Sequence, residues 1–351
     1  MLISQPTLMS RQSILDLIKI DDYSVTPKYQ QLGNSILEAI RRKEINNGDM
    51  MPSINEVSFE FDISRVTVEK GYGELKKTGV LDSVPGKGYF IKSTEIDQNL
   101  SIFLLFNKLS SHKKIIYDTL AEALGKHAAI HFYIYNNDFS LFQQILKNPK
   151  NTYTHYVIIP HFIEGEEKAC DLINEIPKDK LILVDKIPAD ITGEFGAVYE
   201  NFEKDIYNSL VEAKEPLSKY HTLNLIFPEN SYYPKEIIAG FENFCTDFAF
   251  EHKTIGDIAA EKVNKGNAYI NLMEDDLIIL MDKLIGKDLK VGKDVGIISY
   301  NETPLKRFIL NGVSTMSTDF KAMGKTVADL ILTDSKEHIQ NPFHLTLRDS
   351  I

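Results

Sequence analysis

The hydrophobic pattern changes its rhythm near residue 100. Before that point, apolar residues return every three or four positions, which predicts helices. The expected elements are helices over residues 29–42, 53–61 and 64–78, followed by short strands over 80–84 and 89–91. Two helices across a tight turn and then a glycine-tipped hairpin are typical of a winged helix-turn-helix, which lays its second helix in the DNA major groove.

After residue 100, short continuous apolar runs alternate with helical patterns. The expected strands cover 101–106, 130–135, 156–160, 181–184, 222–227, 268–272 and 295–299, with helices over 115–124, 141–146, 166–173, 235–248 and 276–285. Continuous apolar strands between helices predict parallel sheets covered on both faces. Two such series predict two doubly wound lobes with a cleft between them, and ligands of such sheets bind beyond the carboxyl ends of the strands.

A length of 351 residues favours two domains. We expect an α/β protein with a winged helix-turn-helix domain over 1–93, of which 1–26 is an extension without an assigned function. Residues 94–99 are polar and lack periodicity, so we expect a linker there. A two-lobed, doubly wound ligand-sensing domain over 100–351 is predicted to follow.

Charge is distributed unevenly along the chain. The net charge is −11, but residues 1–93 hold 12 basic and 12 acidic residues, and the remainder holds 27 and 38. The first domain is therefore the less repulsive end for DNA, although it is not a basic patch. Arg41, Arg42 and Lys43 at the end of the first helix suit a solvated helix end or a phosphate clamp equally well. A neutral DNA-binding domain needs a dimer, which doubles the phosphate contacts.

The first domain resembles the GntR family of bacterial transcription regulators over residues 27–92. The matching positions are Pro27-Lys28-Tyr29, Gly48-Asp49, Pro52-Ser53, Ser64-Arg65, Thr67-Val68, Leu75, Gly79 and the wing Gly86-Lys87-Gly88. The resemblance implies a DNA-contacting set of Ser53, Asn55, Ser64, Arg65, Thr67, Glu69, Gly86, Lys87 and Gly88. Asn55 and Glu69 stand where the family usually has arginine, so we expect either an unusual DNA sequence or a modest affinity.

The second domain resembles the periplasmic-binding-protein-like sensor domain of LacI/GalR-type regulators from about residue 99 to 351. The matching segments are Val184-Asp185-Lys186, Gly240-Phe241, residues 294–302, Val313-Ser314-Thr315-Met316 and Met323-Gly324. Where the family often has a ligand-holding arginine, this chain has Ile237, and Lys235 is a possible substitute. The resemblance implies a small-molecule effector bound between two lobes.

Polar and aromatic residues that follow the predicted strands are candidates for lining the cleft. They are Asn107, Asn136, Asn137, His161, Asp185, Lys186, Tyr199, Tyr233, Lys235, Asp275 and Asn301. Amides, carboxylates and aromatic faces together suit a monosaccharide or a derivative. Lys235 and His161 leave a phosphorylated sugar open. Each residue taken alone suits a surface loop or a satisfied hydrogen bond equally well.

No pattern indicates an enzyme, a cofactor or a metal site. Gly324-Lys325-Thr326 imitates a phosphate loop, but it falls inside a predicted helix and lacks the earlier glycine. The nine histidines lack ligand spacing. Cys170 and Cys245 are expected to be free thiols. Without a signal peptide or a run of ~18 apolar residues, we expect a cytoplasmic protein that does not enter a membrane.

The sequence therefore predicts a ligand-responsive transcription regulator, a repressor of a carbohydrate-utilisation operon, that binds double-stranded operator DNA as a homodimer. Its effector is expected to be a sugar. Two alternatives stay open: a small-molecule-binding module whose winged helix contacts a protein partner, and a regulator that senses a phosphorylated or non-sugar metabolite.

Overall fold

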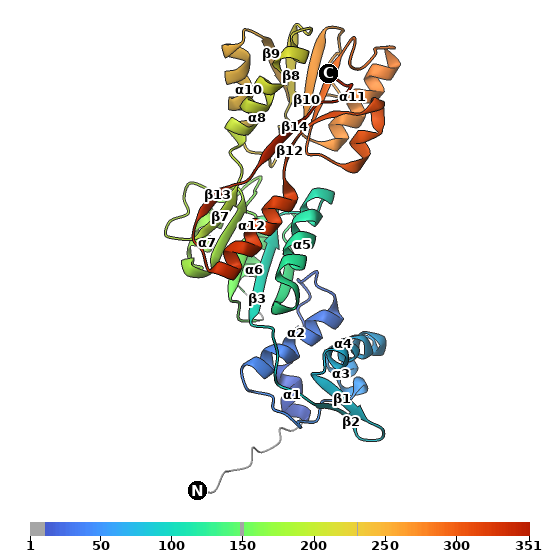
Figure 1. The fold of residues 1–351 in the computed structure, drawn as a ribbon, viewed down its shortest axis with the longest axis vertical. Helices are drawn as coiled ribbons and strands as arrows, with labels where there is room; N and C mark the ends of the chain where they lie inside the picture. Colours follow the sequence, from blue (N-terminus) through green and yellow to red (C-terminus); the bar gives the residue numbers. More distant parts are fainter. Residues whose placement is uncertain (1–10, 148–150, 230) are drawn as a thin grey trace. The chain divides into compact units, whose positions relative to one another are not determined.

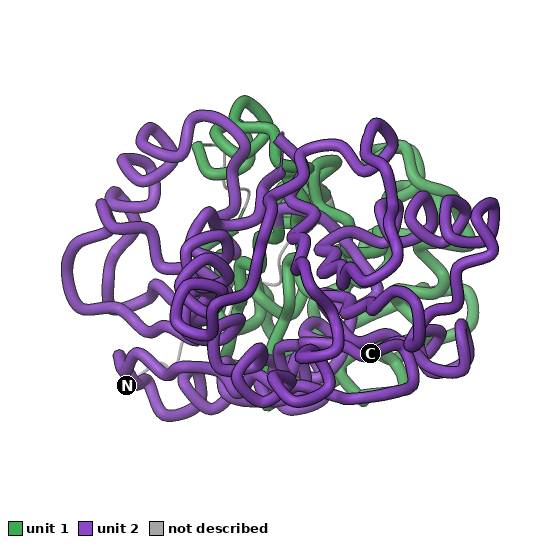
Figure 2. Tube along the Cα trace, turned by 90° about the horizontal axis from the view of Figure 1, so that it is seen from above, with its two compact units in different colours: residues 1–106, 124–158 green, residues 107–123, 159–351 purple. Residues whose placement is uncertain are grey.

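A computed structural model of the chain describes residues 11–147, 151–229 and 231–351 (Figure 1). The chain divides into two compact units, which Figure 2 shows in different colours. Unit 1 holds residues 1–106 and 124–158, and unit 2 holds residues 107–123 and 159–351. Each unit is described by itself below.

Unit 1 begins with the predicted winged helix-turn-helix. Its elements are α1 (Arg11–Leu17), α2 (Lys28–Arg41), α3 (Ile54–Glu60), α4 (Arg65–Lys77), β1 (Leu81–Val84) and β2 (Gly88–Ile91). One apolar core joins them, because Leu32, Val57, Val68 and Ile91 are all fully buried in a single cluster. The predicted helices and the hairpin are confirmed, with ends shifted by one or two residues.

Local signals in the sequence fix where the two central helices begin. Ser53 and Glu56 form the predicted capping box: the Glu56 amide donates to Ser53 Oγ at 3.2 Å, and the Ser53 amide donates to Glu56 Oε2 at 2.6 Å. The hydroxyl of Ser64 accepts the Thr67 amide at 3.1 Å at the start of α4. After α4, Gly79 has a φ of +79°, the conformation that ends many helices.

The rest of unit 1 is a parallel sheet segment. It contains β3 (Leu100–Phe106), β4 (Ala128–Ile134), α6 (Phe139–Lys147) and β5 (His155–Ile158). Strand β3 pairs in parallel with both β4 and β5. Its residues from 101 to 106 are all buried, as the continuous apolar run predicts.

Unit 2 holds a second set of parallel strands. Strand β6 (Leu181–Asp185) pairs with β7 (Gly196–Tyr199), which pairs with β13 (His338–Gln340). The helices of this part are α5 (Ser111–Leu124), α7 (Glu166–Asn174) and α12 (Phe320–Thr333), and α12 packs against β6 and β7. Gly324-Lys325-Thr326 lies inside α12, as predicted, so it does not form a phosphate loop.

A six-stranded sheet completes unit 2, in the order β14-β12-β11-β10-β8-β9. Its strands are β8 (Thr222–Ile226), β9 (Glu251–Ile255), β10 (Asn267–Asn271), β11 (Gly296–Tyr300), β12 (Ser314–Thr318) and β14 (Phe343–Thr346), and only β14 runs antiparallel. Its helices are α8 (Phe202–Glu212), α9 (Lys214–Leu217), α10 (Glu236–Asp247) and α11 (Glu274–Gly286). Separate apolar clusters fill the two faces of this sheet.

Several elements escaped the hydrophobic pattern. Strand β9 has the sequence Glu-His-Lys-Thr-Ile and is exposed except at Ile255, so it has no apolar run. Strands β13 and β14 are short and largely exposed, and β7 and α8 were not expected either. Within the described residues, no helix is long and apolar enough to cross a membrane.

Candidate functional site

The start of α4 presents several predicted DNA-contacting side chains to solvent. Arg65, Val66 and Glu69 are exposed there, and Val66 keeps 72% of its surface. Ser64 and Thr67 are hydrogen-bonded to each other through their hydroxyls at 2.8 Å, so both help to cap the helix. Exposed side chains at the head of a second helix are what insertion into a major groove requires.

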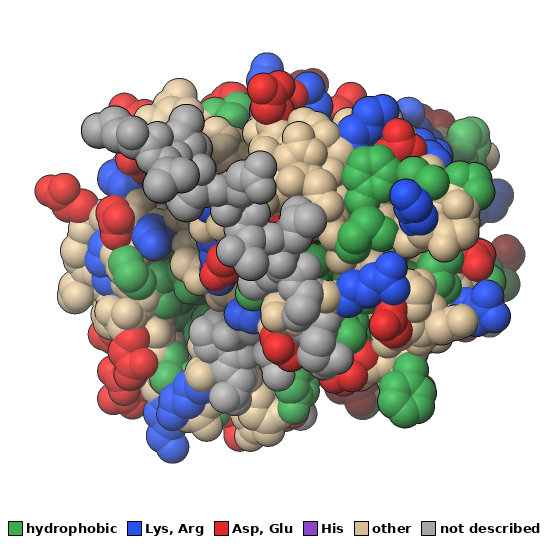
Figure 3. All heavy atoms as spheres, turned by 90° about the horizontal axis from the view of Figure 1, so that it is seen from below, with side chains coloured by type: hydrophobic (Ala, Val, Ile, Leu, Met, Phe, Trp, Pro, Cys, Tyr) green, Lys and Arg blue, Asp and Glu red, His purple; other side chains and the backbone are tan. Residues whose placement is uncertain are grey.

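The hairpin after α4 forms the wing. Gly86 and Gly88 have φ of +78° and +97°, which non-glycine residues rarely adopt. Lys87 between them is exposed, and its carbonyl oxygen accepts a hydrogen bond from Arg11 Nη2 at 3.2 Å. On the face drawn in Figure 3, basic and acidic side chains are interspersed and not segregated, in keeping with the zero balance of the first 93 residues.

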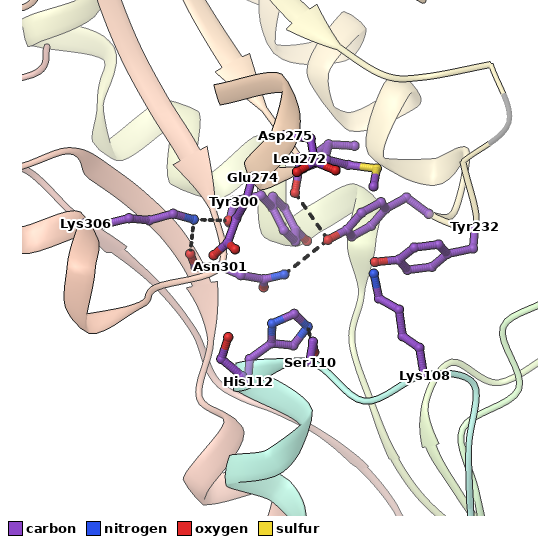
Figure 4. A pocket seen from close by; sticks show the side chains of 13 residues that line it. Lys108, Ser110, His112, Tyr232, Leu272, Glu274, Asp275, Tyr300, Asn301 and Lys306 are labelled. Atoms are coloured by element: carbon purple, nitrogen blue, oxygen red, sulfur yellow. Dashed lines mark hydrogen bonds between the residues drawn. The ribbon is translucent and has the colours of Figure 1, made fainter. Parts of the chain in front are cut away.

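Unit 2 contains a cavity of about 170 Å³, which we call the effector cavity (Figure 4). It is lined by Lys108, Ser110, Ser111, His112, Tyr232, Tyr233, Leu272, Met273, Glu274, Asp275, Tyr300, Asn301 and Lys306. Pockets for drug-sized molecules measure ~300–1,000 Å³, so this one suits a smaller ligand. Its lining comes from segments that follow β3, β8, β10 and β11, at the carboxyl ends of those strands.

Aromatic rings form one wall of the effector cavity. The rings of Tyr232 and Tyr233 are stacked, with centroids 4.8 Å apart and an angle of 24° between their planes. Lys108 Nζ lies 4.4 Å from the centroid of the Tyr232 ring. Figure 4 shows the Lys108 side chain extending toward Tyr232. A flat aromatic surface beside a cation suits the apolar face and the polar edge of a sugar ring.

Polar groups of the cavity are held in place by one another. Asn301, whose φ is +62°, donates through Nδ2 to Tyr233 Oη at 3.2 Å. Tyr233 Oη donates in turn to the Leu272 carbonyl oxygen at 3.3 Å. Lys306 Nζ donates to the carbonyl oxygens of Tyr300 and Asn301, at 2.9 and 2.6 Å. Burial lowers the pKa of Lys306 to about 8, although Glu274 and Glu302 oppose that shift.

Four buried ionisable side chains form a separate group, which we call the charge cluster. Asp185 Oδ2 lies 3.0 Å from His161 Nε2 and 3.6 Å from Lys113 Nζ. The carboxyl group of Glu200 hydrogen-bonds to Asp185. Lys113 also donates to Asn107 Oδ1. All five residues are buried, so each charge depends on its neighbours for stabilisation.

The pKa values of the two carboxyl groups in the charge cluster are shifted in opposite directions. Burial alone raises the pKa of Asp185, but His161 and Lys113 outweigh burial and hold it well below the usual range. Burial and the Asp185 charge raise the pKa of Glu200 well above its ordinary value. Burial lowers the pKa of His161. The two shifts run in opposite directions, which favours the charged form of Asp185 and the neutral form of Glu200.

The structure groups the predicted ligand-binding residues in three ways. Tyr233, Asp275 and Asn301 line the effector cavity. Asn107, His161 and Asp185 belong to the charge cluster, which adjoins the cavity because the rings of His161 and Tyr232 are 6.2 Å apart. The remaining candidates, which are not among the lining residues of the cavity, are Asn136, Asn137, Lys186, Tyr199 and Lys235.

Those five residues have other surroundings. Lys186 is bonded to Glu166 of α7, at 2.8 and 2.9 Å. Tyr199 ends β7, Lys235 is exposed before α10, and Asn136 and Asn137 belong to unit 1. The sequence interpretation missed Lys108, Ser110, His112, Lys113, Glu200, Tyr232 and Lys306. Tyr232 could have been found beside Tyr233, but Lys113 and Lys306 follow no strand directly and gave no signal.

The described residues form a winged helix-turn-helix domain followed by an α/β region built on parallel sheets. Residues 28–91 match the family described as bacterial regulatory proteins, gntR family. The chain is similar to the mannosyl-D-glycerate transport/metabolism system repressor MngR of Escherichia coli (strain K12), 31% identical over 98 residues. That match covers 28% of this chain and 40% of MngR. Residues 28–91 are therefore a GntR-type domain, as predicted.

Two further relatives match in the same region. The HTH-type transcriptional repressor YtrA of Bacillus subtilis (strain 168) is 28% identical over 107 residues, which is 30% of this chain and 78% of YtrA. The arabinose metabolism transcriptional repressor of Geobacillus stearothermophilus is 37% identical over 65 residues, 18% of each chain. The chain thus spans less than half the length of MngR and of the arabinose repressor.

Solved structures match most of the chain in fold. The lac repressor bound to ONPG in its repressed state superposes with a TM-score of 0.58 and 14% identity, covering 82% of this chain and 90% of that one. The trehalose repressor from Escherichia coli gives a TM-score of 0.58 and 13% identity, covering 71% of this chain and all of that one. The predicted LacI-like fold is confirmed.

Proposed function

We propose that this protein is a ligand-responsive transcription regulator that represses a carbohydrate-utilisation operon. The observation that carries the proposal is the presence, in one chain, of an exposed GntR-type recognition helix and a LacI-like domain with a polar, aromatic-walled cavity. The relatives named above include repressors of mannosyl-D-glycerate and arabinose metabolism. Such a regulator works in the cytoplasm and consists of the three parts predicted above, divided near residues 93 and 100.

Operator DNA is contacted, in this proposal, by the head of α4 and by the wing. Arg65 is the strongest candidate for a base contact, because arginine pairs with guanine through two hydrogen bonds. Lys87 at the wing tip reaches a phosphate, and the Ser53 and Ser64 caps orient the two helices. Asn55, Thr67 and Glu69 complete the interface. A homodimer supplies the second half-site, and its two-fold symmetry predicts an inverted repeat in the DNA.

The effector is a monosaccharide or a derivative of one, bound in the effector cavity. The Tyr232 and Tyr233 rings cover its apolar face, and Asn301, Asp275 and Glu274 pair with its hydroxyls. Two lysines in the lining, Lys108 and Lys306, also favour a second class of effector: a sugar that carries a phosphate or carboxylate.

A selection from a random duplex pool tests the DNA half of the proposal. The full-length protein should enrich an inverted repeat, and Arg65→Ala should abolish enrichment while its thermal unfolding is unchanged. A thermal-shift screen against neutral and phosphorylated monosaccharides tests the effector half, because a ligand at a hundredfold excess over its Kd stabilises the fold by ~2.7 kcal/mol. A hit that persists in Tyr232→Ala would remove the cavity from the proposal.

A further inference from the structure

Residues 21–26, which we call the clamp segment, lie along strand β4 of unit 1. Ser24 and Tyr133 form an antiparallel bridge, and the Val25 amide donates to the Phe132 carbonyl oxygen at 2.8 Å. The Phe132 amide donates to Thr26 Oγ1 at 2.9 Å. The clamp segment therefore satisfies backbone groups on the edge of β4 that faces away from β3, as an added strand does.

A buried polar chain secures the beginning of the clamp segment. Tyr133 Oη donates to Asp21 Oδ2 at 3.0 Å and is 2.9 Å from Tyr153 Oη. Asp21 keeps only 6% of its surface, and the two tyrosines keep 1% and 2%. Buried polar groups are costly to leave without partners, so separating Asp21 from Tyr133 is unfavourable.

The clamp segment is equally fixed to the DNA-binding domain. The side chain of Gln31 on α2 donates to the Thr26 carbonyl oxygen at 2.7 Å and accepts the Asp21 amide at 2.8 Å. Helix α1 precedes the segment, and its Ile14 is buried in the core of the winged helix together with Ile18, the residue after the helix. The extension before residue 27 is thus part of the DNA-binding domain on one side and paired with β4 on the other.

Helix α2 makes a second contact with the sheet segment. Arg42 Nη2 donates to Thr152 Oγ1 at 2.8 Å, and Arg41 Nη1 donates to the Asn99 carbonyl oxygen at 3.4 Å. The space enclosed between α2 and the starts of β3 and β4 is about 10 Å³. A single water needs ~10–15 Å³, so this space holds about one water at most.

We infer that the clamp segment locks the winged helix onto strand β4, so that the DNA-binding domain and strands β3–β5 move as one rigid body. The polar stretch 94–99 is then not a flexible linker on its own, because the clamp segment also connects the DNA-binding domain to strands β3–β5. Arg65 and Lys87 remain exposed with the clamp in place. The clamp therefore orients the DNA-contacting surface without covering it, and this inference needs neither the operator nor the effector to be correct.

Spin-label distances in the full-length protein test the inference. Labels on Glu60→Cys and Gln144→Cys report the separation of α3 from α6. Burial raises the pKa of Cys170 to about 11 and that of Cys245 to about 12, so the native thiols stay unlabelled. We expect one narrow distance distribution. The inference would be overturned by a distance distribution that is already broad with the native clamp segment and that the variants below leave unaltered.

Val25→Pro is the disrupting variant, because proline has no amide hydrogen to donate to Phe132. Val25→Ala is its matched control: it keeps the amide, and the valine side chain is 48% exposed, so little packing is lost. Val25→Pro should broaden the distance distribution severalfold, and Val25→Ala should not. Thr26→Val, which removes the acceptor of the Phe132 amide, should speed hydrogen exchange at that amide at least tenfold; unchanged exchange contradicts the clamp.

The functional consequence rests on the proposed function and has its own readout. If the clamp transmits effector binding, Val25→Pro should reduce the effector-induced fold-change in operator affinity toward one, and Val25→Ala should preserve it. A normal response in a Val25→Pro protein whose distances have broadened would refute transmission through the clamp. Failure to bind any DNA would refute the proposed function and leave the distance result standing.

Discussion

The charge cluster makes a specific prediction about two neighbouring carboxyl groups. Asp185→Asn replaces an ionised side chain by a neutral one of the same shape, and asparagine tolerates the φ of +78° at this position. Glu200→Gln replaces a side chain that we expect to be protonated already at neutral pH. The two substitutions therefore differ in charge removed, although both sites are buried and adjacent.

The expected magnitudes follow from the partners that each change leaves behind. Removing one member of a buried ion pair destabilises by about 3–5 kcal/mol, because the other charge stays unpaired. In Asp185→Asn, Glu200 can ionise and become the new partner of Lys113, so we expect a loss of about 1–3 kcal/mol. Glu200→Gln should cost less than ~1 kcal/mol, the scale of one hydrogen bond. The double variant has no carboxylate, and it should lose the full ~3–5 kcal/mol.

Urea unfolding at pH 7 measures these differences as a double-mutant cycle. The account predicts that the double variant loses more than the sum of the two single losses, by at least ~1 kcal/mol. Two results would show that Glu200 is ionised in the native protein: losses of unfolding free energy that are additive, or a Glu200→Gln variant that is destabilised as much as Asp185→Asn.

Three further predictions concern packing, DNA contact and pH. A side chain at Gly240 would collide with the Glu203 carbonyl oxygen of α8, so Gly240→Ala should lower the free energy of unfolding by about 1–3 kcal/mol. The control is Gly286→Ala, which has open space around it and should be neutral or stabilising. Glu69→Arg restores a cation on α4 and should strengthen non-specific DNA binding and steepen its salt dependence; an unchanged salt slope would place position 69 away from DNA. Because its pKa is raised in the folded protein, Glu200 contributes stability that is present below its unfolded pKa of ~4.3 and is lost as pH rises through the folded pKa. The difference in unfolding free energy between the native protein and Glu200→Gln should therefore shrink over that rise. A difference that stays constant with pH would contradict a protonated Glu200.

The winged helix could be predicted closely because its signals are local. The Ser53–Glu56 box, the Ser64 cap and Gly79 each act within a few residues and mark the helix ends directly. The buried strands of the sensor domain were equally visible, since a strand covered on both faces reads as an unbroken apolar run. Edge strands such as β9 carry polar side chains, so nothing in the pattern distinguished them from loops.

The sites could be predicted only in part, because their members come from distant segments. Placing candidates after strands found Tyr233, Asp275 and Asn301, since those side chains lie where parallel strands end. It could not find Lys113, which lies on α5 and becomes a partner of Asp185 only through the fold. Arg41 and Arg42 were interpreted as a helix end or a phosphate clamp; they lie at the end of α2, where both pair with Glu38 and bond to Asn99 and Thr152.

The central claim is that one chain couples DNA binding to the occupation of the effector cavity. Fluorescence anisotropy of a selected operator duplex, titrated with the full-length protein in the absence and presence of a sugar from the thermal-shift screen, measures that coupling. The account predicts at least a tenfold change in Kd, equivalent to ~1.4 kcal/mol, that disappears in Tyr232→Ala. An operator affinity that is the same with and without a sugar that demonstrably binds the cavity would contradict it.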